Sequence, residues 1–118
     1  MRSSRLALLW FLSVLFALAV APVHAQPLKR VEAKHVCMVN NTAFDKDQIP
    51  VEVGGKTYFG CCEMCKGRLA QDAGSRAAVD PVSGKTVDKA TAVIGATPDG
   101  KVYYFESEKT FAEFGKRA

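Results

Sequence analysis

The pattern of hydrophobic and polar positions predicts two successive units with the same order of elements. In each unit a short extended segment rich in turn residues comes first, a β-hairpin follows, and a short helix closes the unit. The first hairpin is expected near 50–53 and 56–59, because Gly54-Gly55 between them is a favourable two-residue turn. The first helix is expected near 62–72.

The second unit repeats this order further along the chain. Its hairpin is expected near 91–96 and 101–105, with a turn at 98–100 that contains Pro, Asp and Gly. Its helix is expected near 107–116, where Ser107 is a suitable N-cap.

Apolar positions identify the face that each helix buries. Phe111 and Phe114 lie on one face of the second helix, and Leu69 takes the same part in the first. We expect Gly74 to end the first helix.

A direct comparison of the two units indicates an internal repeat. Residues 36–41 align with 79–84, and residues 55–60 align with 100–105. The second pair has the longer offset, which places a short insertion in the turn at 97–100. We interpret the repeat as a duplication of one ββα unit, and chance similarity of two such units is the alternative.

The first 25 residues have the layout of a cleaved secretory signal. Arg2 and Arg5 precede an apolar run at 6–20, and small residues stand before Gln26. A retained membrane anchor is the alternative, but the run is shorter than the roughly 20 residues that a spanning helix needs. We therefore predict a signal peptide at 1–25 and a periplasmic or secreted protein with no membrane attachment after cleavage.

Charge and composition narrow the possible functions. The chain has 16 Lys and Arg against 12 Asp and Glu, and these charges are mixed along the sequence. They do not form the basic stripe that nucleic-acid binding requires, so no nucleic-acid partner is expected. The sequence also shows no catalytic triad, phosphate loop or carboxylate pair, so we do not expect an enzyme. A core this small would benefit from a metal or disulfides.

All the cysteines lie in the first unit, at Cys37, Cys61, Cys62 and Cys65. The matching positions of the second unit hold Asp80, Glu106, Ser107 and Thr110. Cysteines with only a packing role would be expected in both units. The asymmetry indicates that the first unit carries the functional site and that the second is its structural partner.

The spacing of the cysteines fits metal chelation. Cys61 and Cys65 are four residues apart at a helix start, so they project from one face, and Cys62 shares a side with Cys65. A helix N-terminus favours the thiolate form that ligates metals. Cys37 would approach from the turn before the hairpin. We therefore predict metal ligands at Cys37, Cys61, Cys65 and Cys62.

Soft thiolate ligands select Cu(I) or Zn(II) over hard cations. Three thiolates suit trigonal Cu(I), and four suit tetrahedral Zn(II). The fourth donor would be Cys62 or His35. Met38 and Met64 are also soft donors beside the cysteines, but we expect them to pack in the core.

Two other roles for the cysteines remain open. Export would place them in an oxidising compartment, where disulfides such as Cys37 with Cys61 or Cys65 would be feasible. Alternatively, the C-x-x-C pair of Cys62 and Cys65 would form a redox site, although no βαβ pattern surrounds it.

The cysteine spacing resembles the TRASH motif, a treble-clef-like domain linked to heavy-metal sensing, trafficking and resistance. Twenty-three residues separate Cys37 from Cys61, and three separate Cys61 from Cys65. The most specific part is the tract at 58–66. The resemblance implies that Cys37, Cys61 and Cys65 bind a metal.

The second unit is similar to the related YHS domain. Residues 80–84 resemble its opening Asp-Pro-Val-Cys-Gly motif, with Ser83 in place of Cys. Residues 103–107 resemble its Tyr-Tyr-Phe-Cys-Ser motif, with Glu106 in place of Cys. The resemblance implies a TRASH-like module at 26–74 and a YHS-like module without cysteines at 75–118.

Together these patterns predict an exported α+β protein of two tandem ββα modules, treble-clef or zinc-ribbon-like in fold. It would bind Cu(I) or Zn(II) for buffering, delivery or sensing and resistance, with a metal-transport or resistance protein as its partner. The alternatives are a structural or interaction module stapled by disulfides or zinc, and a thiol-disulfide oxidoreductase that uses Cys62 and Cys65.

Overall fold

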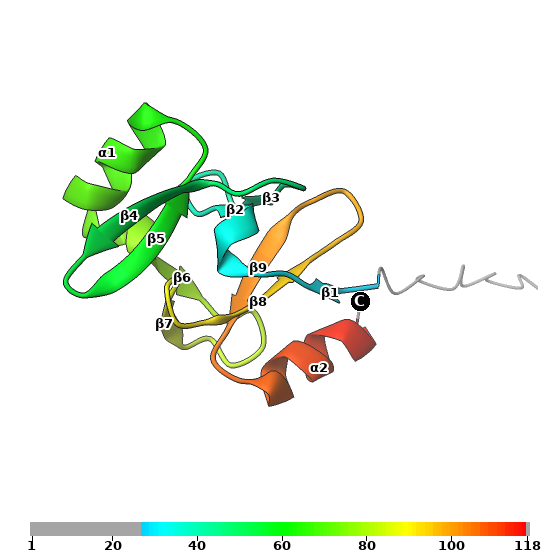
Figure 1. Ribbon diagram of the computed structural model, residues 1–118. Helices are drawn as coiled ribbons and strands as arrows, with labels where there is room; N and C mark the ends of the chain where they lie inside the picture. The colour runs from blue at the N-terminus through cyan, green and yellow to red at the C-terminus, as the bar shows by residue number, and fades with distance from the viewer. Residues whose placement is uncertain (1–26, 118) are drawn as a thin grey trace, which may run out of the picture.

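The computed structural model describes residues 27–117, which form an α+β fold of two helices and several small sheets (Figure 1). The predicted signal peptide at 1–25 lies outside the described residues. Between residues 27 and 117, every helix is too short or too polar to cross a bilayer.

The first half is built around one hairpin and one helix. Its elements in order are β1 (Lys29–Arg30), the 3-10 helix η1 (Ala33–His35), β2 (Val36–Cys37), β3 (Thr42–Ala43), β4 (Ile49–Val53), β5 (Lys56–Gly60) and α1 (Glu63–Gln71). Strands β4 and β5 pair antiparallel around Gly54 and Gly55, whose φ angles of 59° and 78° suit glycine. The predicted hairpin is therefore confirmed, and α1 packs against both of its strands.

The second half has a similar succession of elements. They are the 3-10 helix η2 (Ala73–Arg76), β6 (Ala77–Val79), β7 (Thr86–Asp88), β8 (Val93–Ala96), β9 (Val102–Phe105) and α2 (Glu108–Arg117). Strands β8 and β9 form the predicted hairpin, and β1 adds to its edge to make the sheet β1-β8-β9. Helix α2 packs on this sheet through Phe111 and Phe114, whose rings both contact Phe105.

Two sequence-based expectations about α1 are wrong. Gly74 does not end the helix, because the backbone is already extended at Asp72, with φ −109° and ψ 107°. The Asp72 carboxylate then accepts a hydrogen bond from the Gly74 N–H at 2.9 Å, which starts η2. Met64 is not in the core but 82% exposed, because it lies on the outer side of the first turn of α1.

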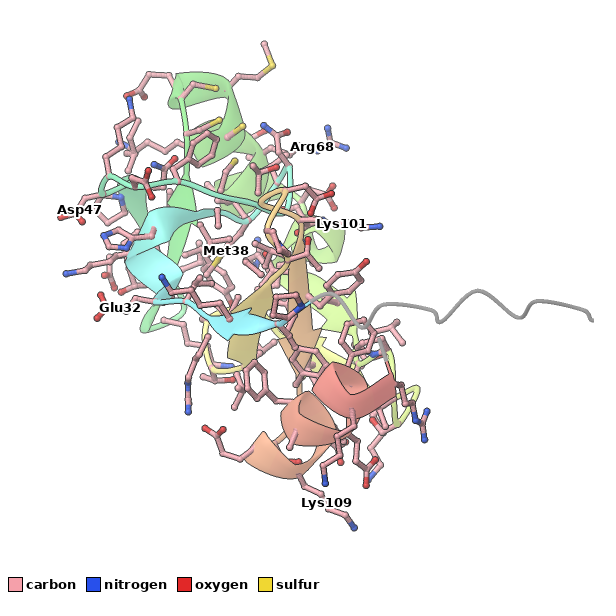
Figure 2. The ribbon with its side chains drawn as sticks, turned by 90° about the vertical axis from the view of Figure 1, so that its right-hand side faces the viewer. Glu32, Met38, Asp47, Arg68, Lys101 and Lys109 are labelled. Carbon is pink, nitrogen blue, oxygen red and sulfur yellow. The ribbon has the colours of Figure 1, made fainter. Side chains whose placement is uncertain are left out.

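Residues from both halves share one hydrophobic core. The first half supplies Val36, Met38, Val51, Tyr58 and Leu69, and the second supplies Ile94, Ala96, Val102 and Tyr104. In Figure 2 Met38 lies inside the molecule, whereas Glu32, Asp47 and Lys109 point outward. Because the two halves bury each other's apolar side chains, the fold does not depend on a metal alone.

A buried carboxylate holds the second half together. Asp80 has no exposed surface, and its Oδ1 accepts hydrogen bonds from the N–H groups of Val82 at 2.7 Å and Ser83 at 3.1 Å. Its Oδ2 accepts from the Glu106 N–H at 2.8 Å and the Thr110 hydroxyl at 2.7 Å. One side chain therefore ties the turn after β6 to the end of β9 and to α2.

We expect Asp80→Asn to lower the free energy of unfolding by about 3 kcal/mol, because an amide nitrogen would face donors that now meet a carboxylate. Burial opposes ionisation, but the hydrogen bonds from Glu106, Thr110, Val82 and Ser83 outweigh it and hold the pKa of Asp80 below its ordinary value of 3.8. The stabilisation that the ionised Asp80 provides is thus complete above about pH 4. It is lost as pH falls through the lower pKa that Asp80 has in the folded state.

Urea unfolding of Asp80→Asn and of the exposed control Asp45→Asn would test this expectation. The difference in free energy of unfolding between the Asp80 variant and the parent protein should decrease below about pH 4. Equal stability of the two variants at neutral pH would contradict the assigned role of Asp80.

Candidate metal centre

Three cysteine sulfurs converge between the end of strand β2 and the N-terminus of helix α1. Cys37 lies at the end of β2, Cys61 directly after β5, and Cys65 in the first turn of α1. The Sγ of Cys65 is 3.9 Å from that of Cys37 and 3.6 Å from that of Cys61, and all three sulfurs lie within 4.8 Å of one another. Residues far apart in sequence thus form one compact donor group.

Local backbone geometry brings Cys61 and Cys65 to the same side. Cys62 is the N-cap of α1 and is extended, with φ −157° and ψ 173°, so the chain turns sharply from β5 into the helix. At Gly60 an added Cβ would lie 3.0 Å from the Cβ of Cys65. The strand can therefore run close behind Cys65 only because residue 60 has no side chain.

The surroundings of Cys37 favour its thiolate. Burial of Cys37 would raise its pKa, but hydrogen bonds from the backbone of Asn40, from the Cys61 thiol and from the backbone of Val39 and Cys61 lower the pKa below the ordinary thiol value. Such a group of converging backbone N–H groups is a typical anion-binding arrangement. Of the three clustered thiols, only Cys37 has a lowered pKa.

The pKa values of the other two clustered thiols are raised. The hydrogen bond between the thiols of Cys61 and Cys37 raises the pKa of Cys61, and burial adds to this effect. Burial raises the pKa of Cys65 to about 12, and hydrogen bonds with Cys62, Cys61 and Cys37 act in the same direction. A metal ion would displace these protons, since thiolates and not thiols are metal ligands.

The sulfur separations fit a metal ion. A metal–sulfur bond of about 2.3 Å places two sulfurs about 3.8 Å apart in tetrahedral geometry and about 4.0 Å apart in trigonal geometry. The separations of 3.6 and 3.9 Å at Cys65 are close to both values. The cluster could therefore hold an ion with only small side-chain rotations.

Other residues named from the sequence lie outside this group. Cys62 is exposed, and its sulfur is not one of the three that lie within 4.8 Å of each other. His35 instead pairs with Asp47, with Nε2 3.1 Å from Oδ1. All four cysteines are free thiols.

Cys62 has a different electrostatic setting from the three clustered cysteines. A hydrogen bond from the backbone of Cys65 lowers the pKa of Cys62, and the Cys65 thiol adds to the effect. Cys62 is thus an exposed thiol that readily ionises, next to the cluster but not within it.

Two polar neighbours of the cluster are not among the residues that the sequence motifs identify. Asn40 donates a hydrogen bond from Nδ2 to the Sγ of Cys61 at 3.6 Å, and its position in a turn three residues after Cys37 was the available signal. Lys89 donates from Nζ to the carbonyl oxygen of Met38 at 2.6 Å. No signal in the sequence connects Lys89 with the cysteines, because 51 residues separate it from Met38.

Comparisons of the chain with models of known protein families, with curated proteins and with solved structures find no match. The chemical interpretation of the centre therefore depends on its own geometry and on the sequence motifs.

We expect alkylation of the reduced, metal-free protein to begin at Cys62, because this thiol is exposed and its pKa is lowered. Cys37 and Cys65 have exposed fractions of 0% and 7% and should react at least about tenfold more slowly. Timed iodoacetamide quenching with peptide mass spectrometry measures these rates. In urea the four thiols should react alike, and a folded-state rate at Cys65 equal to that at Cys62 would contradict the geometry.

Proposed function

We propose that this protein binds one soft metal ion through the thiolates of Cys37, Cys61 and Cys65. The observation that supports the proposal is the convergence of three sulfurs within 4.8 Å from two separate parts of the chain, strand β2 and the tract at 61–65. Packing alone does not require three thiols to meet, and soft ions prefer thiolate ligands.

Cu(I) is the ion that this donor set suits best. Three thiolates complete a trigonal Cu(I) site, whereas tetrahedral Zn(II) needs a fourth ligand, such as Cys62 after a side-chain rotation, or water. Cys37 and Cys65 are buried and Cys61 is exposed, so the ion would be reached from the Cys61 side. Capture and release then proceed by ligand substitution with a partner's thiols or thioethers.

The biological role that fits this chemistry is metal buffering, delivery or sensing in heavy-metal homeostasis. The resemblance of the cysteine tract to the TRASH motif supports this role, and the signal-like residues 1–25 support action in the periplasm or outside the cell. A metal-transport or resistance protein is the proposed partner. We assign no catalytic reaction to the centre.

The proposal includes a duplicated ββα unit whose second copy has lost its metal. Residues 39, 40 and 61 direct backbone groups at Cys37, and residues 82, 83 and 106 direct theirs at Asp80. These positions correspond in the sequence alignment of the two units. The turns that follow also correspond, since Asn41 and Gly84 both have positive φ, at 53° and 75°. In the second unit the Asp80 carboxylate thus takes the place of the Cys37 thiolate.

A thiol-disulfide oxidoreductase is the second candidate. One observation favours it: Cys62 is exposed, its pKa is lowered, and Cys65 follows it in a C-x-x-C sequence at a helix start. An oxidoreductase would require Cys62, whereas the proposed metal site requires Cys37.

Metal titration of single variants distinguishes these functions. We expect Cys37→Ser to weaken Cu(I) binding by more than about 100-fold. Removal of a metal ligand should reduce the affinity more than removal of a residue that only hydrogen-bonds to a ligand, which costs up to about 100-fold. Cys62→Ser, the matched control from the same tract, should change the affinity by less than about threefold. Competition with a chromogenic Cu(I) chelator measures both affinities, and native mass spectrometry reports the stoichiometry and any disulfide.

The reduced parent protein should bind one Cu(I) and remain folded when the ion is removed, because its core is shared by both halves. Absence of stoichiometric binding, or loss of binding in Cys62→Ser with retention in Cys37→Ser, would exclude the proposed site. Unfolding on metal removal would instead indicate a purely structural zinc site.

A further inference from the structure

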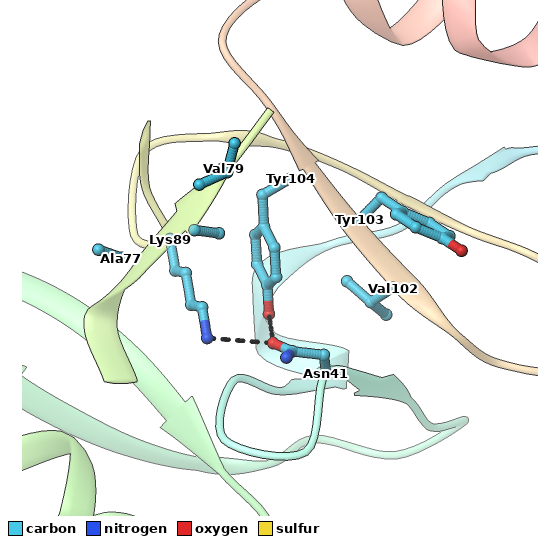
Figure 3. Close-up of a pocket in the computed structure, with 8 residues that line it drawn as sticks. Asn41, Ala77, Val79, Lys89, Val102, Tyr103 and Tyr104 are labelled. Carbon is cyan, nitrogen blue, oxygen red and sulfur yellow. Dashed lines mark hydrogen bonds between the residues drawn. The ribbon is translucent and has the colours of Figure 1, made fainter. Parts of the chain in front are cut away.

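Lys89 is a buried lysine whose side chain lies between the two halves of the protein. Its exposed fraction is 5%, and its Nζ donates to the Met38 carbonyl at 2.6 Å and to the Asn41 Oδ1 at 3.1 Å. Figure 3 shows the ammonium group and the Tyr104 hydroxyl meeting at Asn41 beside a cavity of about 230 Å³. The Nζ also lies 5.2 Å from the centroid of the Tyr104 ring.

The partners of this ammonium group are all neutral. Within residues 27–117, the ion pairs of the lysine and arginine side chains do not include Lys89. An isolated buried cation is costly, because a carbonyl and an amide replace only part of its hydration. Burial accordingly lowers the pKa of Lys89, while the charge of Cys37 acts in the opposite direction.

The acceptors of Lys89 belong to the turn that carries the first metal ligand. Met38 follows Cys37 directly, and Asn41 ends the same turn with a positive φ of 53°. The ammonium group is therefore held against the turn that follows Cys37. The Tyr104 hydroxyl donates to the same Asn41 Oδ1 at 3.0 Å, so it lies against the same turn.

Metal binding would leave a net negative charge at this place. Three thiolates around Zn(II) carry one net negative charge, and three thiolates around Cu(I) carry two. A fixed buried cation stabilises the second complex more than the first, since the Coulomb energy grows with charge and solvent screening is weak there.

We propose that Lys89 is the buried counter-charge of the thiolate centre and biases it toward Cu(I) over Zn(II). This inference rests on the proposed metal-binding function. Lys89 is a positioning and selectivity residue rather than a ligand, because its nitrogen is bonded to the turn and not to the ion.

The test compares Cu(I) and Zn(II) affinities of the full reduced protein with those of Lys89→Met. We expect Cu(I) affinity to fall by about tenfold and Zn(II) affinity by about threefold, since the Coulomb energy of the first complex is about twice that of the second, so that the affinity ratio changes about threefold in favour of Zn(II). Chelator competition measures each ion separately. Lys101→Met is the matched control: its Nζ also lies 5.2 Å from a tyrosine ring centroid, that of Tyr103, but its side chain is exposed. It should leave both affinities unchanged.

A second variant separates the charge from the hydrogen bond. Lys89→Gln keeps a donor for the Met38 carbonyl and removes the charge, so it should change the affinity ratio as Lys89→Met does, even if the methionine variant folds poorly. Equal weakening of both ions in Lys89→Gln, or no weakening, would overturn the counter-charge role alone. Failure of the parent protein to bind either ion would overturn the proposed function and this inference with it.

Discussion

The turn from Val36 to Asn41 is fixed from both halves of the protein, and the rest of the structure depends on that constraint. The N–H of Met38 donates to the carbonyl of Phe59 at 2.9 Å, while its side chain is fully buried in the shared core. Its carbonyl accepts from Lys89, and the Asn41 side chain accepts from Tyr104 at 3.0 Å. Because the backbone of this turn is held on both sides, Cys37 has a defined place opposite α1.

The same constraint explains how the metal centre and the fold relate. Many small thiolate sites form only when a metal draws the ligands together. Here the shared core and the hydrogen bonds of the turn hold Cys37 next to Cys65, at 3.9 Å between sulfurs. The position of Cys37 thus follows from contacts within the protein chain itself.

Local patterns in the sequence predicted the elements around the site well. The Gly54-Gly55 turn, the buried Leu69 and the apolar face of α2 are short-range features, and they appear where the pattern placed them. Expectations failed where distant contacts decided the outcome. Strand β1 joins the edge of β8, which no local pattern shows. Helix α1 ends where the backbone becomes extended at Asp72, before Gly74, and Met64 faces outward whereas Cys65 in the same turn is buried.

The sequence by itself determined the chemical character of the candidate centre, since Cys37, Cys61 and Cys65 supply soft sulfur donors. It also determined the two hairpins, because turn chemistry acts within a few residues. Only the tertiary structure decided that Cys62 lies outside the three-sulfur group and that Lys89 reaches the Met38 carbonyl across 51 residues. The physical reason is that burial and electrostatic contacts depend on which surfaces pack together, and spacing along the chain does not specify that packing.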